Sequence, residues 1–486
     1  MTDLAYSTAT DLSAALAART VSSVELADHL IARIEALDHH TNAVVVRDFD
    51  RARTAAALAD QALAQGDQRP LLGIPMTVKE SFNVTGLPTT WGMPACKDFH
   101  PAADAATIER IKAAGAVILG KTNVPLNLGD WQSYNDVYGT TSNPWDLGRT
   151  PGGSSGGAAA ALASGFTPLE LGSDIGGSLR APAHFCGVYA HNPSRGLVPV
   201  RGHIPPGVPS LPRESDLMVC GPMARSAADL DLLLDVLAGP DLDTAIGHRL
   251  ALPPSRHRAL NDFRVLVIDT HPLLPTGRAV TEAIGALCER LAPEVGKIAR
   301  TSPLLPDLAT NARIYAQLLS AAFAADLPPE EYRRLEAAAT SVAGDDTSLA
   351  AARARGNALS HRDWIVADRM REGHKQRWRE LFREWDVVVA PVLPTPAFPH
   401  DHSAGVGRRI RIDGQDCDYE DQLLWAGLST LPGLPATAMP VGLSDTGLPV
   451  GVQVIGPFLE DRTTIAFARL VEQAFGGFVR PPPFAP

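Results

Sequence analysis

Hydrophobic and polar residues follow one another along the chain in patterns that predict helices and strands in turn. Near the N-terminus, apolar residues recur at helical spacing over 26–34, directly behind a capping box formed by Ser22 and Glu25. A short apolar run at 43–46 predicts a strand, and the Ala-rich segment 51–64 predicts another helix. We expect these first helices to cover a sheet that continues further along the chain.

Three further runs have the composition of short buried strands. Residues 71–78 are almost entirely apolar and end on Lys79, and residues 115–120 are β-branched and bounded by glycine. Residues 167–173 follow a Gly-Ser-rich segment and an Ala-rich helix. We also expect Asp104 to cap the helix between the first two runs. The alternation of strands with helices predicts an α/β sheet.

The pattern changes after residue 240. Residues 241–385 are rich in Ala, Arg and Glu and carry long helical periodicity, as in 363–385, without Gly-rich signals. Strand-like runs return at 386–390 and 451–455. We therefore expect a single large α/β domain in four parts: N-terminal covering helices (1–70), a core (71–240), a helical cap insertion (241–385) and a C-terminal part that completes the sheet (386–486).

Composition narrows the classes of function. The chain has 486 residues, of which 45% are hydrophobic and 20% charged, and a net charge of -11. Without a basic stripe it is not expected to bind nucleic acid, and no apolar run is long enough to span a membrane. The five scattered cysteines form no C-x-x-C pair, which argues against a zinc site or a disulfide framework. The N-terminus lacks the pattern of a signal peptide, so we expect a cytoplasmic protein.

Two clusters of glycine and serine, 152–157 and 172–178, follow one another closely. A Gly-rich turn before a helix can hold a phosphate, but neither a Gly-Lys-Ser/Thr nor a GxGxxG sequence is present. Gly152-x-Ser154-x-Gly156 also matches the nucleophile elbow of α/β-hydrolases. That motif needs a buried strand directly before the serine, whereas a loop with two prolines precedes it here.

A third interpretation places both serine clusters in one site. Ser178 ends a Gly-rich turn in which the backbone N–H groups from Ile175 to Gly177 can face an anion that develops on a carbonyl oxygen. A serine hydroxyl needs a base to become a nucleophile, and neither cluster holds a suitably placed His or Asp. The base must therefore come from another part of the chain.

Together these segments resemble the amidase signature enzymes. The resemblance rests on 152–157, on Gly172 to Arg180 followed by Ala-Pro, and on Gly73-Ile-Pro-x-x-Val-Lys79. It spans nearly the full chain and is loose only from about 240 to 385. It implies the amidase signature fold, with a mixed central β-sheet flanked by helices. It also implies hydrolysis of a carboxylic amide through an acyl-enzyme, without metal or other cofactor.

The resemblance assigns a role to each residue of the site. Ser178 corresponds to the acylated nucleophile, Ser154 to a bridging serine and Lys79 to the base that starts a proton relay. The peptide bond before Ser154 is expected to be cis. The other implied residues are an oxyanion hole of Ile175, Gly176, Gly177 and Ser178, a hydrogen-bonding support at Ser155, and an ion pair of Asp174 with Arg180.

The base of this relay has to be a neutral lysine. Lowering the pKa of Lys79 from about 10.4 to roughly 7–8 means that the ammonium form is destabilised relative to the neutral amine by some 3–4 kcal/mol of differential solvation. Burial of the side chain must cause this destabilisation. A lysine at the end of a strand is more often a solvated surface residue. The apolar run before Lys79 is consistent with a strand that carries it into the interior.

The substrate-binding residues are less well defined by the sequence. Leu128, Gly129, Asp130 and Trp131 occupy a stretch that lines the acyl pocket in a relative, and Trp131 and Tyr134 could stack on an aromatic group. The insert 205–213 is expected to form a loop near the mouth of the site. The chain departs from the usual family sequence at His191-Asn192, where relatives commonly carry Lys.

These features lead to an amidohydrolase of small aryl or aliphatic amides, with esters and carbamates also open as substrates. The expected partner is a small-molecule amide, with no nucleic acid and no membrane, and homodimerisation is left open. The alternative function is that of the glutaminase subunit in a glutamyl-tRNA(Gln) amidotransferase complex, which shares the fold and the three relay residues.

Overall fold

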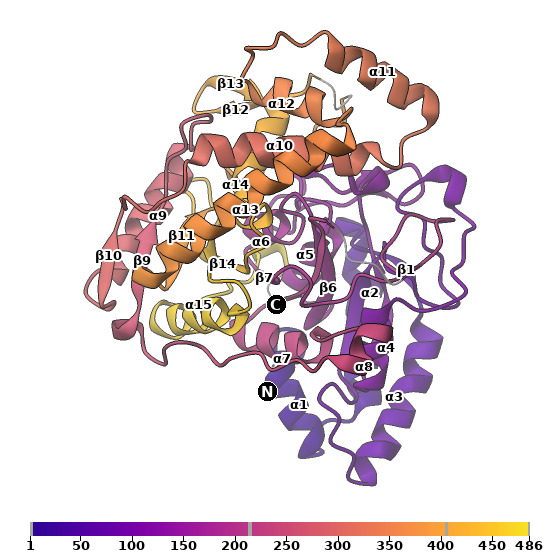
Figure 1. The fold of residues 1–486 in the computed structure, drawn as a ribbon. Coiled ribbons are helices and arrows are strands. Elements are labelled where there is room, and N and C mark those ends of the chain that lie inside the picture. Colours follow the sequence, from indigo (N-terminus) through magenta and orange to yellow (C-terminus); the bar gives the residue numbers. More distant parts are fainter. Residues whose placement is uncertain (1–2, 212–215, 404–406, 485–486) are drawn as a thin grey trace.

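Strands from both ends and the middle of the chain pair into one mixed sheet in the computed structural model, which describes residues 3–211, 216–403 and 407–484 (Figure 1). Among these residues the sheet has 11 strands in the order β1-β3-β2-β6-β8-β7-β14-β15-β11-β9-β10. In that order their bounds are Val44–Arg47, Val117–Thr122, Pro75–Lys79, Leu169–Asp174, Val219–Ala224, Tyr189–Asn192, Ala436–Leu443, Pro449–Ile455, Val387–Pro391, Arg264–Val267 and Lys297–Ala299. Two small ribbons pair β4 (Tyr134–Asn135) with β5 (Gly139–Thr140) and β12 (Arg409–Ile412) with β13 (Gln415–Asp418).

Helices pack on both faces of this sheet (Figure 1). Their bounds are α1 Ala9–Ala17, α2 Ser23–Thr41, α3 Phe49–Ala64, α4 Ala106–Ala113, α5 Gly156–Ala163, α6 Arg180–Cys186, α7 Ala227–Leu237, α8 Leu242–Gly247, α9 Arg278–Leu291, α10 Leu308–Ala324, α11 Pro329–Thr340, α12 Leu349–Gly356, α13 His361–Glu384, α14 Leu423–Thr430 and α15 Asp461–Phe475. The chain thus forms a single large α/β domain, as expected.

Strand β11 illustrates why the central strands read as continuous apolar runs. Successive side chains of a strand point to opposite faces of the sheet. Val387 and Val389 join the hydrophobic core on one face, whereas Val388 and Ala390 join the core on the other. Because helices cover both faces, every position of such a strand is buried, and the alternation seen in one-sided sheets is lost.

The direction of two neighbouring strands places the site. β2 runs parallel to β6, with Thr77 opposite Glu170 and Val78 opposite Leu171. Lys79 ends β2 and Asp174 ends β6. Because parallel strands present their carboxyl ends at the same edge, the lysine and the Gly-rich turn after Asp174 leave the sheet side by side.

Of the two helix caps predicted from the sequence, one is confirmed and the other is wrong. The capping box of Ser22 and Glu25 is present at the start of α2. The capping role expected for Asp104 is wrong, since α4 follows Ala105 without a side-chain cap. The Asp104 carboxylate instead accepts the backbone N–H of Thr85 at 2.7 Å and pairs with Lys112 at 2.7 Å. A tertiary contact and an ion pair therefore occupy this side chain.

The segment 241–385, expected as a helical cap, also supplies two strands. β9 and β10 pair in parallel and extend the sheet beyond β11. The apolar residues of β9 are only a few positions long, so their signal is weak beside the helices that surround them. α10, α11 and α12 form the layer at the top of Figure 1.

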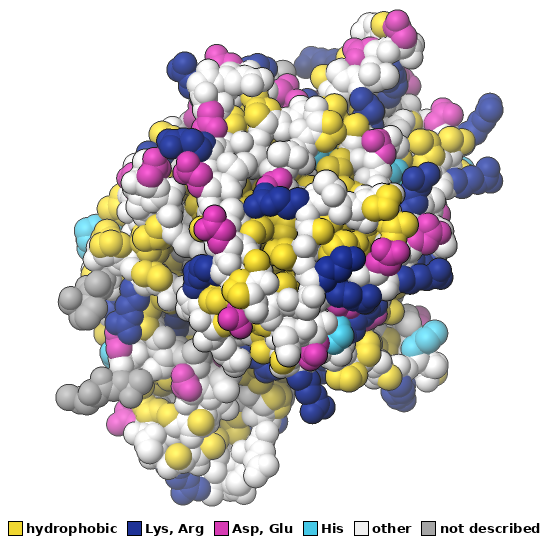
Figure 2. Space-filling view, turned by 90° about the vertical axis from the view of Figure 1, so that its left-hand side faces the viewer, with side chains coloured by type: hydrophobic (Ala, Val, Ile, Leu, Met, Phe, Trp, Pro, Cys, Tyr) yellow, Lys and Arg dark blue, Asp and Glu magenta, His cyan; other side chains and the backbone are white. Residues whose placement is uncertain are grey.

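The surface carries both signs of charge. Figure 2 shows one face on which acidic and basic side chains are intermixed rather than gathered into one basic area. Within the described ranges, no helix is both long and apolar enough to cross a membrane.

Candidate active site

Lys79 lies at the carboxyl end of β2 and is fully buried. Val78 belongs to the hydrophobic core on one face of the sheet, so the Lys79 side chain extends toward the opposite face. Its Nζ is 2.6 Å from the Oγ of Ser154 and 2.9 Å from the Oγ of Ser173. The structure therefore joins Lys79 to one of the two serines expected to share its relay.

The protonation of Lys79 is set by burial. Desolvation lowers the pKa of Lys79 to about 7, although nearby Asp174, Cys220 and Glu170 favour the charged form. Burial also raises the pKa of Glu170 to about 8 and that of Cys220 to about 12. Near neutral pH, a substantial fraction of Lys79 is thus an uncharged amine in contact with a hydroxyl group.

Ser154 follows a cis peptide bond, Gly153–Ser154, as expected from the sequence. Gly153 is needed for close approach, because a Cβ at that position would lie 2.3 Å from the carbonyl oxygen of Asp130. α5 begins two residues after Ser154, and all its residues are buried. Ser154 is thereby held between a tightly packed glycine and a buried helix, 2% exposed.

Ser178 and Ser154 line the same cavity. The backbone N–H of Ser155 donates to the Ser178 carbonyl at 3.2 Å, which ties the two serine clusters together. Within the part of the chain that the structure describes, no hydrogen bond joins the two hydroxyl groups directly. Of the two contacts that the expected relay needs, the described chain therefore has the one between Lys79 and Ser154.

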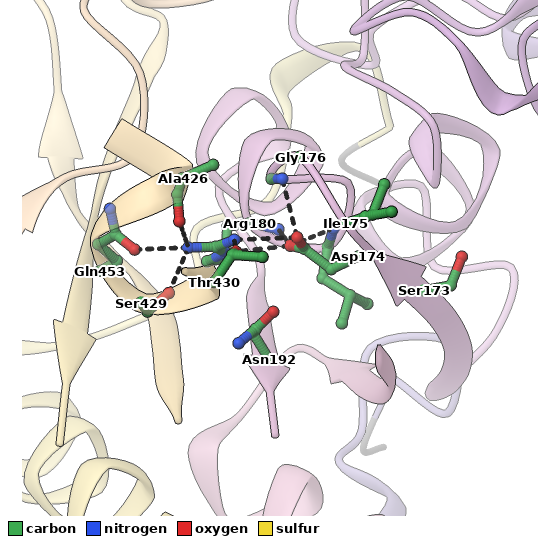
Figure 3. Close-up of polar contacts among 12 residues, drawn as sticks. Ser173, Asp174, Ile175, Gly176, Arg180, Asn192, Ala426, Ser429, Thr430 and Gln453 are labelled. Atoms are coloured by element: carbon green, nitrogen blue, oxygen red, sulfur yellow. Dashed lines mark hydrogen bonds and ion pairs between the residues drawn. The ribbon is translucent and has the colours of Figure 1, made fainter. Parts of the chain in front are cut away.

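Asp174 organises the turn that precedes Ser178 (Figure 3). Its carboxylate accepts the backbone N–H groups of Gly177 at 2.8 Å and Leu179 at 3.0 Å. It also accepts from the guanidinium of Arg180 at 2.9 and 3.0 Å. Burial alone would raise the pKa of Asp174, but Arg180 and the backbone donors lower it below its usual value. The expected ion pair is thus present and fully buried.

Arg180 is in turn fixed by the C-terminal part of the chain. Its remaining guanidinium hydrogens reach α14 and β15, as Figure 3 shows. The acceptors are the Ala426 carbonyl at 3.1 Å, Ser429 Oγ at 2.7 Å, Thr430 Oγ1 at 2.8 Å and Gln453 Oε1 at 2.8 Å. The turn before Ser178 is therefore anchored in segments more than 240 residues away along the chain.

The backbone N–H groups of the turn differ in availability. The N–H of Gly177 is already donated to Asp174. The N–H groups of Ile175, Gly176 and Ser178 have no acceptor among residues 3–211, 216–403 and 407–484. Gly177 has φ +94°, a backbone conformation that L side chains rarely adopt. Gly177 thus shapes the turn, and the N–H groups of the other three residues are free of acceptors in the described part of the chain.

Two neighbouring serines have supporting positions. Ser155 donates from Oγ to the carbonyl of Ser173 at 3.3 Å. No role for Ser173 is predicted from the sequence, although this serine lies in the second Gly-Ser cluster and contacts Lys79 directly. The signal is present in the cluster, but only the pairing of β2 with β6 reveals that Ser173 faces Lys79.

The residues from Leu128 to Tyr134 that were expected to bind substrate do not all face the cavity in the structure. Leu128 lines the cavity that contains Ser178. Trp131 is buried and donates from Nε1 to the carbonyl of Gly176 at 2.9 Å. Asp130 pairs with Arg408 at 2.6 Å, and Tyr134 accepts from the same arginine at 3.2 Å. Gly129 is exposed. Leu128 is therefore the member of this stretch that meets the cavity.

The cavity has a volume of about 390 Å³ and mostly apolar walls. The apolar lining residues are Trp91, Leu128, Ile175, Val200, Ile204, Pro205, Leu211, Met218, Ala322, Phe323 and Ala325. The polar lining residues include Asn127, Ser154, Ser173, Ser178, Arg201, His203, Ser210, Asp216 and Asp326. Part of the insert 205–213 thus lies at the cavity, as expected, and its residues 212 and 213 lie outside the described ranges.

The histidines near the site are weak bases. Burial and the nearby Lys79 lower the pKa of His203 to about 3, and its Nε2 is 3.0 Å from the Oγ of Ser81. Burial lowers the pKa of His184 to about 4, and both of its ring nitrogens contact backbone groups. Both are therefore poor proton acceptors near neutral pH.

The departure at His191-Asn192 lies on β7, away from Lys79. The Nε2 of His191 is 3.0 Å from the carboxylate of Asp461, and its Nδ1 is 2.9 Å from Thr437 Oγ1. Asp461 also accepts from the Oγ of Ser194 at 2.7 Å. These contacts join β7, β14 and the start of α15, so His191 has a structural position. No cluster of potential metal ligands is found among the described residues.

Comparison with known proteins agrees with this fold. A family model described as Amidase matches residues 25–465. The chain is 31% identical to fatty-acid amide hydrolase 2-A of Danio rerio, over 95% of this chain and 87% of the relative. It is 32% identical to a glutamyl-tRNA(Gln) amidotransferase subunit of Anaeromyxobacter sp. (strain K), over 96% of each.

A solved structure gives the same result in three dimensions. It was described in work on a vestigial protein complex and the evolutionary origins of an s-triazine catabolic enzyme. It superposes with a TM-score of 0.80 at 27% identity, over 96% of this chain and 99% of its own. Fold and site thus define an enzyme that hydrolyses amide C–N bonds. The chain belongs to the Amidase family, the amidase signature enzymes.

Proposed function

We propose that this protein is an amidohydrolase in which Ser178 forms an acyl-enzyme and Lys79 and Ser154 relay the proton. The observation that carries the proposal is the 2.6 Å contact between Lys79 Nζ and Ser154 Oγ, in which a fully buried amine with a pKa of about 7 meets a hydroxyl group. A neutral amine in that position can accept a proton, which an ammonium group cannot.

In the first half of the reaction, neutral Lys79 takes a proton from Ser154, and Ser154 takes one from Ser178. The Oγ of Ser178 forms a bond to the amide carbonyl carbon, and the C=O electron pair moves to the oxygen. Ser154 then returns a proton to the amide nitrogen, the C–N bond breaks, and the amine leaves. Lys79 restores the proton to Ser154, so the relay is ready for the second half.

In the second half, water replaces the amine. Ser154 accepts a proton from the attacking water and passes one to Lys79, and the oxygen of that water bonds to the acyl carbon. The bond to Ser178 Oγ then breaks, and the serine recovers its proton through Ser154. The products are a carboxylic acid and the free enzyme, and no cofactor enters either half.

The oxyanion formed in both halves requires backbone donors. Among the four residues expected to form the oxyanion hole, Ile175, Gly176 and Ser178 have N–H groups without a partner in the described chain. We propose these three as the donors, with Gly177 giving the turn its shape through Asp174. Removing one such donor costs about 100-fold or more in kcat in other serine hydrolases.

The cavity favours substrates that are apolar on at least one side of the amide. Its walls are mostly apolar, and a volume of about 390 Å³ suits a small aryl or aliphatic group. Asp216, one of its carboxylates, is paired with Arg195 and Arg371. We therefore propose small aryl or aliphatic amides as substrates, with esters and carbamates of the same shape as further ones.

The alternative function is that of a glutaminase subunit in a tRNA-dependent amidotransferase. It is favoured by the 32% identity to the glutamyl-tRNA(Gln) amidotransferase subunit. Hydrolysis of glutamine, assayed beside that of acyl anilides with the purified chain, distinguishes the two functions. Release of ammonia from glutamine that depends on added partner subunits would favour the alternative.

A fluorophosphonate probe tests the nucleophile directly, because it forms a stable adduct with an activated serine. We expect peptide mass spectrometry to find the adduct on Ser178, and the Ser178→Ala variant to remain unlabelled. Ser154→Ala should slow the labelling without moving it. An adduct on Ser154, or labelling that is unaffected by Lys79→Ala, would overturn the relay.

A further inference from the structure

A tyrosine from the helical layer above the sheet reaches the turn that precedes Ser178. Tyr315 lies on α10, and its hydroxyl donates to the carbonyl of Ile175 at 2.6 Å. The tyrosine is fully buried. Its aromatic ring is packed against α14, because a Cβ placed on Gly427 would lie 2.5 Å from Tyr315 Cδ1. The hydroxyl group is therefore held in one position.

This hydrogen bond determines the direction of a neighbouring N–H group. In a planar trans peptide, the C=O of one residue and the N–H of the next point in opposite directions. The carbonyl of Ile175 and the N–H of Gly176 belong to the same peptide. By holding the carbonyl, Tyr315 directs the N–H of Gly176 away from α10. That N–H is one of the three donors of the turn without an acceptor in the described chain.

The next peptide of the turn is held from both ends. Trp131 Nε1 donates to the carbonyl of Gly176 at 2.9 Å, and the N–H of Gly177 donates to Asp174 at 2.8 Å. In contrast, among the described residues the peptide between Ile175 and Gly176 has a side-chain hydrogen bond only at its carbonyl, from Tyr315. Among the described side chains, Tyr315 therefore alone hydrogen-bonds the peptide between Ile175 and Gly176. The peptide between Gly176 and Gly177 is held by both Trp131 and Asp174.

We propose that Tyr315 is a positioning residue that orients the Gly176 N–H toward the oxyanion. This inference rests on the proposed acyl-enzyme function of Ser178. Tyr315 does not touch the reacting atoms itself. Its effect passes through a single peptide plane, and it acts on the transition state, where the negative charge develops, more than on the bound substrate.

α10, which carries Tyr315, also contributes to the wall of the cavity. Ala322, which follows Tyr315 by two helical turns, and Asp326, which lies just after the end of α10, line the cavity. The same helical segment thus contacts the oxyanion turn with one residue and forms the cavity wall with others. A substrate that packs against this wall therefore adjoins the helix that holds the Gly176 peptide.

The test uses Tyr315→Phe, which removes the hydroxyl group and keeps the ring. Tyr6→Phe is the matched control, because the Tyr6 hydroxyl also donates to a backbone carbonyl, that of Phe484, at 3.0 Å and far from the cavity. Tyr315→Phe loses the bond to the Ile175 carbonyl, whereas Tyr6→Phe loses the bond to the Phe484 carbonyl and also the one that the Tyr6 hydroxyl accepts from the Arg33 guanidinium at 3.0 Å. We expect Tyr6→Phe to lose at least as much thermal stability as Tyr315→Phe, so a slower labelling of Tyr315→Phe alone is not explained by lost stability.

The readout that separates positioning from mere structure is the rate at which a fluorophosphonate labels Ser178. The phosphoryl oxygen of the probe uses the same donors as the oxyanion. We expect Tyr315→Phe to lower the second-order labelling rate and kcat by about tenfold or more, with a much smaller change in KM. Tyr6→Phe should leave the labelling rate unchanged. Equal labelling rates in Tyr315→Phe and wild type would overturn the proposal.

The outcome for the wild type keeps this inference distinct from the proposed function. If the wild type is not labelled on Ser178, the acyl-enzyme proposal itself fails. If the wild type is labelled and Tyr315→Phe is labelled equally fast, only the role of Tyr315 fails. Trp131→Phe adds a graded comparison. Because Asp174 still holds the peptide between Gly176 and Gly177, we expect this variant to lose less labelling rate than Tyr315→Phe.

Discussion

The amine of Lys79 is 2.6 Å from the hydroxyl oxygen of Ser154, and the pKa of this buried lysine is lowered to about 7. If the neutral amine is the base, kcat/KM rises with pH and levels off above about pH 7. On the acid side it falls about tenfold per pH unit. A pH profile with a neutral amide substrate measures this. Lys79→Ala should lose most activity at every pH, and a profile that is flat between about pH 5 and 9 would contradict a lysine base.

Lys79 should also reduce stability near neutral pH. Its pKa is about 7 when folded and near 10.5 when unfolded, so between these values the unfolded chain binds the additional proton. The free energy of unfolding therefore rises with pH across this interval, and the cost of burying the lysine is largest at and below pH 7. We expect Lys79→Met to be more stable than the wild type at pH 7 by about 1–3 kcal/mol, after allowing for the lost hydrogen bonds.

Urea unfolding of both proteins at several pH values measures this difference. The advantage of Lys79→Met should shrink as the pH approaches 10.5, the value for the unfolded lysine. A difference that is independent of pH would mean that Lys79 is not desolvated in the folded protein.

The ion pair of Arg180 with Asp174 is predicted to be costly to break. Arg180→Met leaves a buried carboxylate without its cation, which typically costs about 3–5 kcal/mol, and it loosens the turn before Ser178. We expect a large loss of both stability and activity. The control is Arg53→Met, because the Arg53–Asp28 pair is exposed and such pairs contribute at most about 1 kcal/mol. Equal effects of the two variants in urea unfolding would contradict the prediction.

Phe323 is predicted to contribute to substrate binding. It lines the cavity, and its side chain is 53% exposed in the structure. Phe323→Ala removes apolar surface that a substrate can cover, so KM for an aryl amide should rise by about 3- to 30-fold, with less effect on kcat. Val479→Ala, at a residue that is similarly exposed at 54%, is the control. Unchanged KM values for aryl and aliphatic amides would exclude Phe323 from the binding surface.

The sequence predicts much of the site because its residues lie in short, distinctive segments. The run before Lys79 has the pattern of a buried strand, and the two Gly-Ser clusters have unusual composition. The structure joins Lys79 to Ser154 and Asp174 to Arg180, both of which the resemblance to the amidase signature enzymes grouped together. The cis bond before Ser154 was also predicted.

Other features depend on contacts that no local pattern records. In the sequence, Tyr315 is simply a residue on the apolar face of an amphipathic helix. Only the packing of α10 against α14 brings it to Ile175. Asp104 has the residue type of a helix cap, but its carboxylate is bound by Thr85 and Lys112 instead. Asp130 and Tyr134 lie close in sequence to Leu128, yet their contacts with Arg408 depend on a segment far along the chain.

The parallel strands β2 and β6 carry Lys79 and the turn before Ser178, whereas most of the cavity wall comes from other segments. Lys79 and the turn before Ser178 leave adjacent strand ends of a buried sheet, whereas the cavity walls come largely from 200–211, from 216–218 and from the end of α10. Replacing those wall segments would alter which amide is accepted while leaving the sheet that carries the relay intact. An engineer seeking a new substrate would accordingly vary Leu211, Ala322 or Phe323 and keep Tyr315, whose hydroxyl donates to the carbonyl of Ile175 in the turn before Ser178.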